Sequence, residues 1–139
     1  MSLTPGSDAK LLLPDGWAPP RGYSHALSVF GRMIIIAGQI GWNPRTAKFE
    51  TDDFTGQVRQ ALSNIVALLA EAGASPSQLV RLTWFITDRE EYLAARREVG
   101  AAYRELMGKH YPPMSIVVVS ALIEKQARVE IEATAVISE

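Results

Sequence analysis

Two carboxylates near the C-terminus have a spacing that suits chemistry. Glu130 and Glu132 are two residues apart among apolar neighbours, so on a β-strand both side chains point to the same face. A carboxylate in a cleft can orient a water molecule or move a proton. The alternative is a solvated strand face, because glutamate is rarely buried without a partner. The spacing does not suit a glycosidase, whose two carboxylates flank the scissile bond.

Other common catalytic groups are few. His25 and His110 are far apart in the sequence, and neither has a second ligand at helical or strand spacing, so we expect no metal site. The chain has no cysteine, which excludes disulfides and a cysteine nucleophile. It also lacks the G-x-S-x-G, P-loop and G-x-G-x-x-G motifs. His25 lies just before a predicted strand, where it either lines a cleft or lies on the surface.

Apolar spacing and turn residues predict the elements that position these groups. Prolines and glycines crowd residues 14–22, so we interpret residues 1–22 as an irregular lead-in and residues 23–139 as a single domain. Gly31-Arg32 indicates a tight hairpin between the first two strands. Strands are expected at 25–30, 33–37, 79–87, 114–120 and 128–137, with helices from Asp52 or Asp53 to Gly73 and from Arg89 to Met107.

The order β-β-α-β-α-β-β favours an α+β fold in which one sheet is covered on one face by both helices. On the last strand, Val129 and Ile131 would pack beneath the helices, while Glu130 and Glu132 would share the other face with apolar residues of a neighbouring strand. Such a face is too apolar for open water, so we infer a homo-oligomer that buries it. A monomer with a mixed sheet face is the alternative.

Composition excludes several classes of protein. The chain of 139 residues is 47% hydrophobic and 21% charged, which is ordinary for a globular domain. Its net charge of −1 provides no strong field for nucleic acid or an anionic membrane. It has neither a signal-peptide pattern nor an apolar run of about 18 residues. We therefore expect a cytoplasmic protein without a nucleic-acid or membrane partner.

Two tryptophans have different expected roles. Trp84 alternates with Leu82 and Ile86 on a predicted strand, so it is interpreted as a core residue. Trp42 precedes the turn at residues 43–46, where we expect it to be exposed as a pocket wall or an interface residue.

Five short motifs, in their order and spacing, resemble the Rid (reactive intermediate deaminase, YjgF-like) family. They are Gly22-Tyr23-Ser24-His25-Ala26, Ala37-Gly38-Gln39-Ile40, Asn43-Pro44, Tyr111-Pro112-Pro113-Met114-Ser115 and V-E-I-E-A-T-A at 129–135. The resemblance implies a Rid-like domain over residues 23–139 and a chorismate mutase-like trimer, with a small-molecule cleft between subunits. It also implies hydrolysis of imines and enamines to a keto acid and ammonia, without a cofactor.

Carried over motif by motif, the resemblance assigns Glu130 and Tyr23 as catalytic residues, with Glu130 positioning the attacking water. Gly38 matches a family cleft residue. Met114 replaces the arginine that binds the substrate carboxylate, and Ile116 replaces a cysteine.

His25 and Trp42 complete the predicted substrate-binding set, and the family's helical asparagine corresponds to Gly100. Methionine cannot form a charge-assisted contact to a carboxylate. We therefore predict an imine or enamine hydrolase of altered specificity, unless Arg21, Arg32 or another basic residue reaches the cleft. A non-catalytic ligand-binding or regulatory trimer is the alternative. The family's endoribonuclease activity is least favoured, because the chain has no catalytic histidine pair and no basic run.

Overall fold

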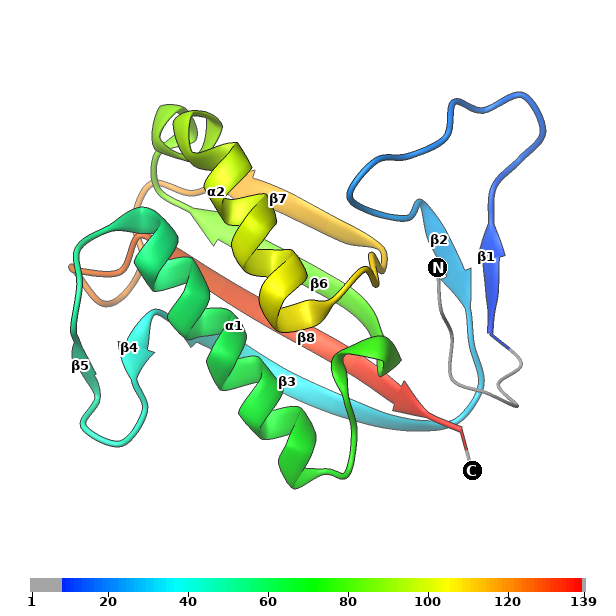
Figure 1. Cartoon of the computed structure of the whole chain (residues 1–139), viewed down its shortest axis with the longest axis horizontal. Helices are drawn as coiled ribbons and strands as arrows, with labels where there is room; N and C mark the ends of the chain where they lie inside the picture. Colours follow the sequence, from blue (N-terminus) through cyan, green and yellow to red (C-terminus); the bar gives the residue numbers. More distant parts are fainter. Residues whose placement is uncertain (1–8, 139) are drawn as a thin grey trace.

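The computed structural model describes residues 9–138 as a four-stranded sheet covered on one face by two helices (Figure 1). In order across the sheet, the strands are β3 (Arg32–Ile40), β8 (Val129–Ile137), β6 (Leu79–Ile86) and β7 (Met114–Val118). Neighbouring strands are antiparallel, except that β6 and β7 are parallel. The helices are α1 (Phe54–Glu71) and α2 (Arg89–Met107). The predicted α+β class is confirmed.

The first predicted strand does not join this sheet, so the hairpin expected at Gly31-Arg32 is wrong. The remaining elements are β1 (Lys10–Leu12), β2 (Ala26–Ser28), β4 (Trp42–Asn43), β5 (Lys48–Phe49) and the short 3-10 helix η1 (Pro76–Gln78). β2 pairs with β1, and the two form a ribbon apart from the sheet (Figure 1). β1 lies within residues 1–22, which the sequence predicts to be irregular. β3 instead pairs with β8, and the two nine-residue strands are paired along most of their length.

The core lies between the helices and the sheet, as the alternation of the last strand predicts. Val129 and Ile131 are fully buried beneath the helices, whereas Glu132 is exposed on the opposite face. Helix α1 buries the stripe of apolar residues that faces the sheet, with one exception. Leu68 is 43% exposed, because it lies at the margin of the stripe rather than over the sheet.

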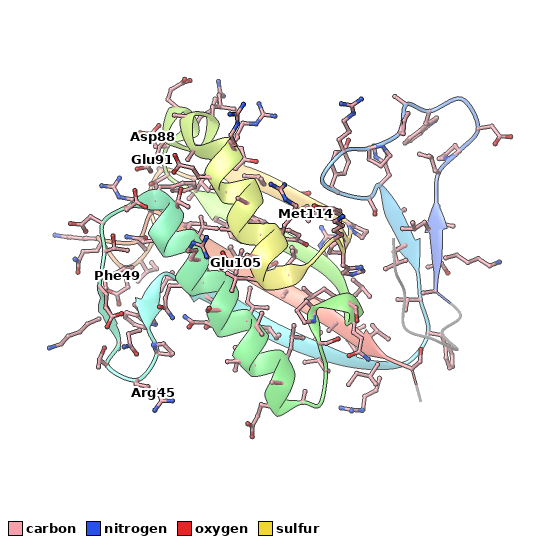
Figure 2. The ribbon with its side chains drawn as sticks, in the orientation of Figure 1. Arg45, Phe49, Asp88, Glu91, Glu105 and Met114 are labelled. Atoms are coloured by element: carbon pink, nitrogen blue, oxygen red, sulfur yellow. The ribbon has the colours of Figure 1, made fainter. Side chains whose placement is uncertain are left out.

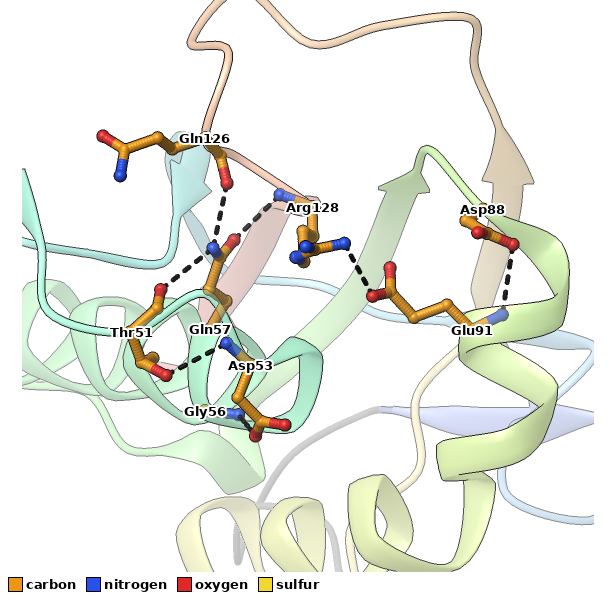
Figure 3. A network of polar contacts seen from close by, with 8 residues as sticks. All are labelled: Thr51, Asp53, Gly56, Gln57, Asp88, Glu91, Gln126 and Arg128. Carbon is orange, nitrogen blue, oxygen red and sulfur yellow. Dashed lines mark hydrogen bonds and ion pairs between the residues drawn. The ribbon is translucent and has the colours of Figure 1, made fainter.

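Capping residues fix the ends of the helices. Asp53 caps α1 by accepting a hydrogen bond from the amide of Gly56 at 2.9 Å, and Asp88 caps α2 by accepting one from the amide of Glu91 at 3.2 Å (Figure 3). Helix α2 ends at Gly108, whose φ of 73° is a conformation that glycine adopts without strain.

Gln57 of α1 is fully buried, although its side chain is polar. Its Nε2 donates to the carbonyls of Thr51 at 3.2 Å and Gln126 at 2.9 Å, and its Oε1 accepts from the amide of Arg128 at 2.8 Å (Figure 3). One side chain therefore ties the start of α1 to the segment that leads into β8.

Gln57→Ala is expected to lower the free energy of unfolding by about 1–3 kcal/mol, because it leaves buried backbone groups without partners. Ser63→Ala is the matched control, since Ser63 is exposed on the same helix. Urea unfolding of both variants measures the difference. Equal stability of the two variants would show that the Gln57 network is replaceable by water.

Candidate active site

A cavity of about 590 Å³ lies between α2, the edge strand β7 and the segment before β2. It brings together Tyr23, Met114 and Ile116, three residues that the sequence assigns to one cleft. Gly100 of α2 also lines this space, which we call the Met114 cavity. Figure 2 shows Met114 at the start of β7, close to α2. Trp84 forms part of the wall and is only 2% exposed, as expected of a core residue.

Backbone contacts hold Tyr23 next to Met114. The amide of Ser24 donates to the carbonyl of Pro112 at 3.3 Å, and Ser24 forms a parallel bridge with Pro113. The loop that carries Tyr23 is thereby attached to the residues immediately before β7.

The parallel pairing of β6 and β7 decides which face Met114 and Ile116 occupy. Met114 is opposite Leu82, and Ile116 is opposite Trp84. Both partners are buried beneath the helices. Because paired residues share a face of the sheet, Met114 and Ile116 point toward α2.

Two stacked tyrosines line the same cavity. The rings of Tyr103 and Tyr111 lie 5.4 Å apart, and the Tyr103 hydroxyl donates to the carbonyl of His110 at 2.6 Å. Burial, and secondarily the neighbouring Tyr111, raises the pKa of Tyr103 far above its ordinary value. Tyr103 therefore remains protonated and holds the loop in place. Nε2 of His110 lies 2.7 Å from the carbonyl oxygen of Leu79, so this buried histidine also has a structural role.

Glu130 and Gly38 lie on the opposite face of the sheet. Glu130 alternates with Val129 and Ile131, which are buried beneath the helices, so its carboxylate points to the open face. Gly38 lies against this carboxylate, because a Cβ on Gly38 would come within 2.7 Å of the carboxyl carbon of Glu130. Within one chain, the sheet separates this pair from Met114.

Several apolar side chains share the open face of the sheet with Glu130. Val117 is opposite Phe85, which is in turn opposite Glu130, so Val117 rather than Ile116 shares the Glu130 face. Met33 and Ile35 are on this face too, with 62% and 69% of their surface exposed. An exposed apolar patch of this kind is typical of an interface.

The other two predicted binding residues have different positions. His25 is exposed and packs edge-on against Tyr23 with ring centroids 5.3 Å apart, so it lies at the rim of the site. It lines a smaller space of about 230 Å³ that Tyr23 and Met114 also line. Trp42 is half-buried in β4 and packs on Phe49 at 6.0 Å, away from the other site residues of the chain.

Three arginines line the Met114 cavity. Arg21 is one of the basic residues that the sequence suggests as a substitute for the missing arginine. Arg32, the other, begins β3 and does not line the cavity. Arg96 and Arg104 of α2 were not indicated by any motif. Their only signal is spacing, since Arg96, Gly100 and Arg104 are four residues apart and lie on one side of the helix.

Among residues 9–138, no three histidine, aspartate or glutamate side chains come together as ligands for a metal ion. No helix in this part of the chain is long and apolar enough to cross a membrane.

Comparison with known proteins gives the family. The profile of the family described as Endoribonuclease L-PSP matches residues 16–137. The chain belongs to this family. Its relatives include Rid proteins, and among them the 2-iminobutanoate/2-iminopropanoate deaminase of Escherichia coli is 36% identical over 109 residues, covering 76% of this chain and 80% of the relative.

Solved structures of Rid-family proteins have the same fold. The crystal structure of the Rid protein YyfB from Yersinia pestis matches with a TM-score of 0.81 and 31% identity, over 93% of this chain and 98% of that one. E. coli TdcF, crystallised with bound serine, matches with a TM-score of 0.66 and 32% identity, over 88% and 92% of the two chains.

Proposed function

We propose that this Rid-family protein hydrolyses imine or enamine small molecules in a cleft between the subunits of a homotrimer. The supporting observation is that the site residues fall into two half-sites on opposite faces of the sheet. Tyr23 and Met114 belong to one half, and Gly38 and Glu130 belong to the other. A neighbouring subunit then supplies the missing half. The exposed apolar side chains on the Glu130 face of the sheet are suited to that contact.

Glu130 is the residue proposed to handle water. Its carboxylate accepts a proton from water while the water oxygen attacks the imine carbon and the C=N π electrons move to nitrogen. Glu130 then delivers this proton to the nitrogen, which gives a carbinolamine. As its C–N bond breaks, the hydroxyl proton passes to the departing nitrogen, which leaves as ammonia, and the oxygen forms the carbonyl group of the product. Tyr23, at the rim of the Met114 cavity, supplies a hydroxyl that orients the substrate or the water. The imine is already electrophilic, so the reaction needs no cofactor.

Met114 is proposed to alter the specificity of this reaction. An arginine at this position would offer a bidentate contact to a carboxylate directly beside the reacting carbon. Methionine offers an apolar, adaptable surface instead. The substrates of the E. coli deaminase, according to its name, are small 2-imino acids. This chain is therefore proposed to act poorly on such small acids.

We expect wild-type protein to release ammonia only slowly from freshly generated 2-iminopropanoate. Met114→Arg should raise kcat/KM roughly ten- to a hundredfold, because a charge-assisted contact contributes about 1.5–3 kcal/mol. Met114→Leu is the matched control and should give no gain. The E. coli deaminase is assayed in parallel. A wild-type rate equal to that of the deaminase would contradict the role proposed for Met114.

The second candidate is a non-catalytic ligand-binding or regulatory trimer. It is supported by the size of the Met114 cavity and its three arginines, which can bind a ligand without any contribution from Glu130. Failure to hydrolyse every imine tested, together with retained ligand binding, would favour this candidate. RNA cleavage by purified protein would favour an endoribonuclease instead.

A further inference from the structure

We infer that Arg96 and Arg104 of α2 form an anion-binding pair in the Met114 cavity, and that the substrate is a larger imine or enamine. In that substrate an apolar or aromatic spacer separates the anionic group from the C=N carbon. The reaction in this inference rests on the proposed function, whereas the binding of the anion rests on the cavity alone.

The geometry of α2 brings the two arginines to the same space. Arg96, Gly100 and Arg104 are four residues apart, which aligns them along one side of the helix. All three line the Met114 cavity. A Cβ on Gly100 would lie 3.4 Å from Nη1 of Arg104, so the guanidinium of Arg104 folds back over Gly100. The glycine therefore makes room for the Arg104 guanidinium between the two arginine positions.

Most of the acidic residues of α2 lie away from this cavity. Three of its four glutamates recur every seven residues, at 91, 98 and 105, and so lie on another side of the helix. Glu91 pairs with Arg128 at 2.8 Å, and Glu105 pairs with Arg59 of α1. Figure 2 shows Glu105 between the two helices. Glu98 accepts a hydrogen bond from the hydroxyl of Thr55 at 3.4 Å.

The three arginines that line the cavity, by contrast, are not neutralised by carboxylates of the described part of the protein. In the part of the chain that the structure describes, no carboxylate forms an ion pair with Arg96, Arg104 or Arg21. Three positive charges therefore share one cavity without a protein counter-ion. A bound anion would relieve their repulsion and accept charge-assisted hydrogen bonds.

The remaining walls of the cavity are suited to the apolar part of a ligand. Trp84, Met114 and Ile116 form the sheet side, and the stacked rings of Tyr103 and Tyr111 form another wall. The volume of about 590 Å³ suits a ligand of drug-like size rather than a three-carbon acid.

The position of the anion explains the preference for longer substrates. In a 2-imino acid the carboxylate is bonded directly to the reacting carbon, so an anion site on α2 would hold that carbon on the helix side of the cavity. A spacer allows the anion to reach α2 while the C=N carbon extends beyond the edge strand β7. At that position the C=N carbon can approach the Glu130 half-site of the neighbouring subunit.

Calorimetric titration of the purified full chain tests the anion pair with 4-phenylbutyrate and with its uncharged amide. The wild-type protein should bind the acid at least tenfold more tightly than the amide. The double variant Arg96→Gln/Arg104→Gln should lose at least tenfold in affinity for the acid. The matched control is Arg89→Gln/Arg97→Gln, which removes the same charge from α2 outside the cavity and should bind like wild type.

Gly100→Leu provides a second, independent variant, because its side chain would occupy the space of the Arg104 guanidinium. It should abolish binding of the acid while circular dichroism and sedimentation remain those of wild type. Equal affinity for acid and amide, or no difference between the two double variants, would overturn the anion pair.

Activity assays separate this inference from the proposed function. The same two double variants are compared on a longer imine whose terminal carboxylate is separated from the C=N carbon by an aromatic spacer. Hydrolysis of the longer imine that drops at least tenfold in Arg96→Gln/Arg104→Gln supports both proposals. A rate of hydrolysis that is the same in Arg96→Gln/Arg104→Gln as in wild type overturns the inference and leaves the proposed function unaffected. Arginine-dependent binding without hydrolysis of any imine overturns the proposed function alone.

Discussion

Glu130→Gln is expected to lower kcat for imine hydrolysis by roughly 10²–10⁴-fold, which is the contribution of a general acid–base residue. Glutamine preserves the size of the side chain and its contact with Gly38, but it cannot accept a proton from water. Ammonia release measures the loss, and thermal unfolding checks that the fold is intact. Glu132→Gln is the matched control, because Glu132 lies two residues away on the same face and is more exposed. It should retain wild-type activity.

The Glu130→Gln variant also tests whether the active site is shared between subunits. Tyr23→Ala inactivates the other half-site, so trimers that mix the two variants should recover part of the wild-type rate. Recovery is expected because some interfaces join an intact Tyr23 half to an intact Glu130 half. Native mass spectrometry verifies the composition of the mixed trimers. A monomer in sedimentation, or mixed trimers without recovery, would contradict the inter-subunit cleft.

Gly38→Ala is expected to lower activity by about 10²-fold, because a displacement of about 1 Å in a reacting group can cost that much. The added Cβ would come within 2.7 Å of the carboxyl carbon of Glu130, so the carboxylate has to move. The change is small and should leave the oligomeric state unaltered. Steady-state kinetics of ammonia release, together with sedimentation, tests both expectations.

A double-mutant cycle shows whether Gly38 acts through Glu130. If it does, adding Gly38→Ala to Glu130→Gln should cause little further loss, because the proton acceptor is already absent. If the two losses multiply instead, Gly38 has an effect of its own and is not a positioning residue for Glu130.

Local patterns in the sequence determined the elements and one face of the sheet. Helix α2 spans Arg89–Met107 as predicted, because its ends depend on residues that are neighbours in the chain, here Asp88 and Gly108. The alternation from Val129 onward likewise determined that Glu130 lies opposite the core. The motif order also indicated the family, which the comparisons confirm.

Only the tertiary structure decided which segments meet. β3 pairs with β8 rather than with β2, because an apolar strand can pair with a near or a distant partner and only the packed chain selects one. Gln57 is buried because its hydrogen-bonding partners come from two distant segments of the chain. Arg96 and Arg104 reach the Met114 cavity because α2 packs over β7. Helical spacing shows that two residues share a side, but only the packing of the helix shows what that side faces.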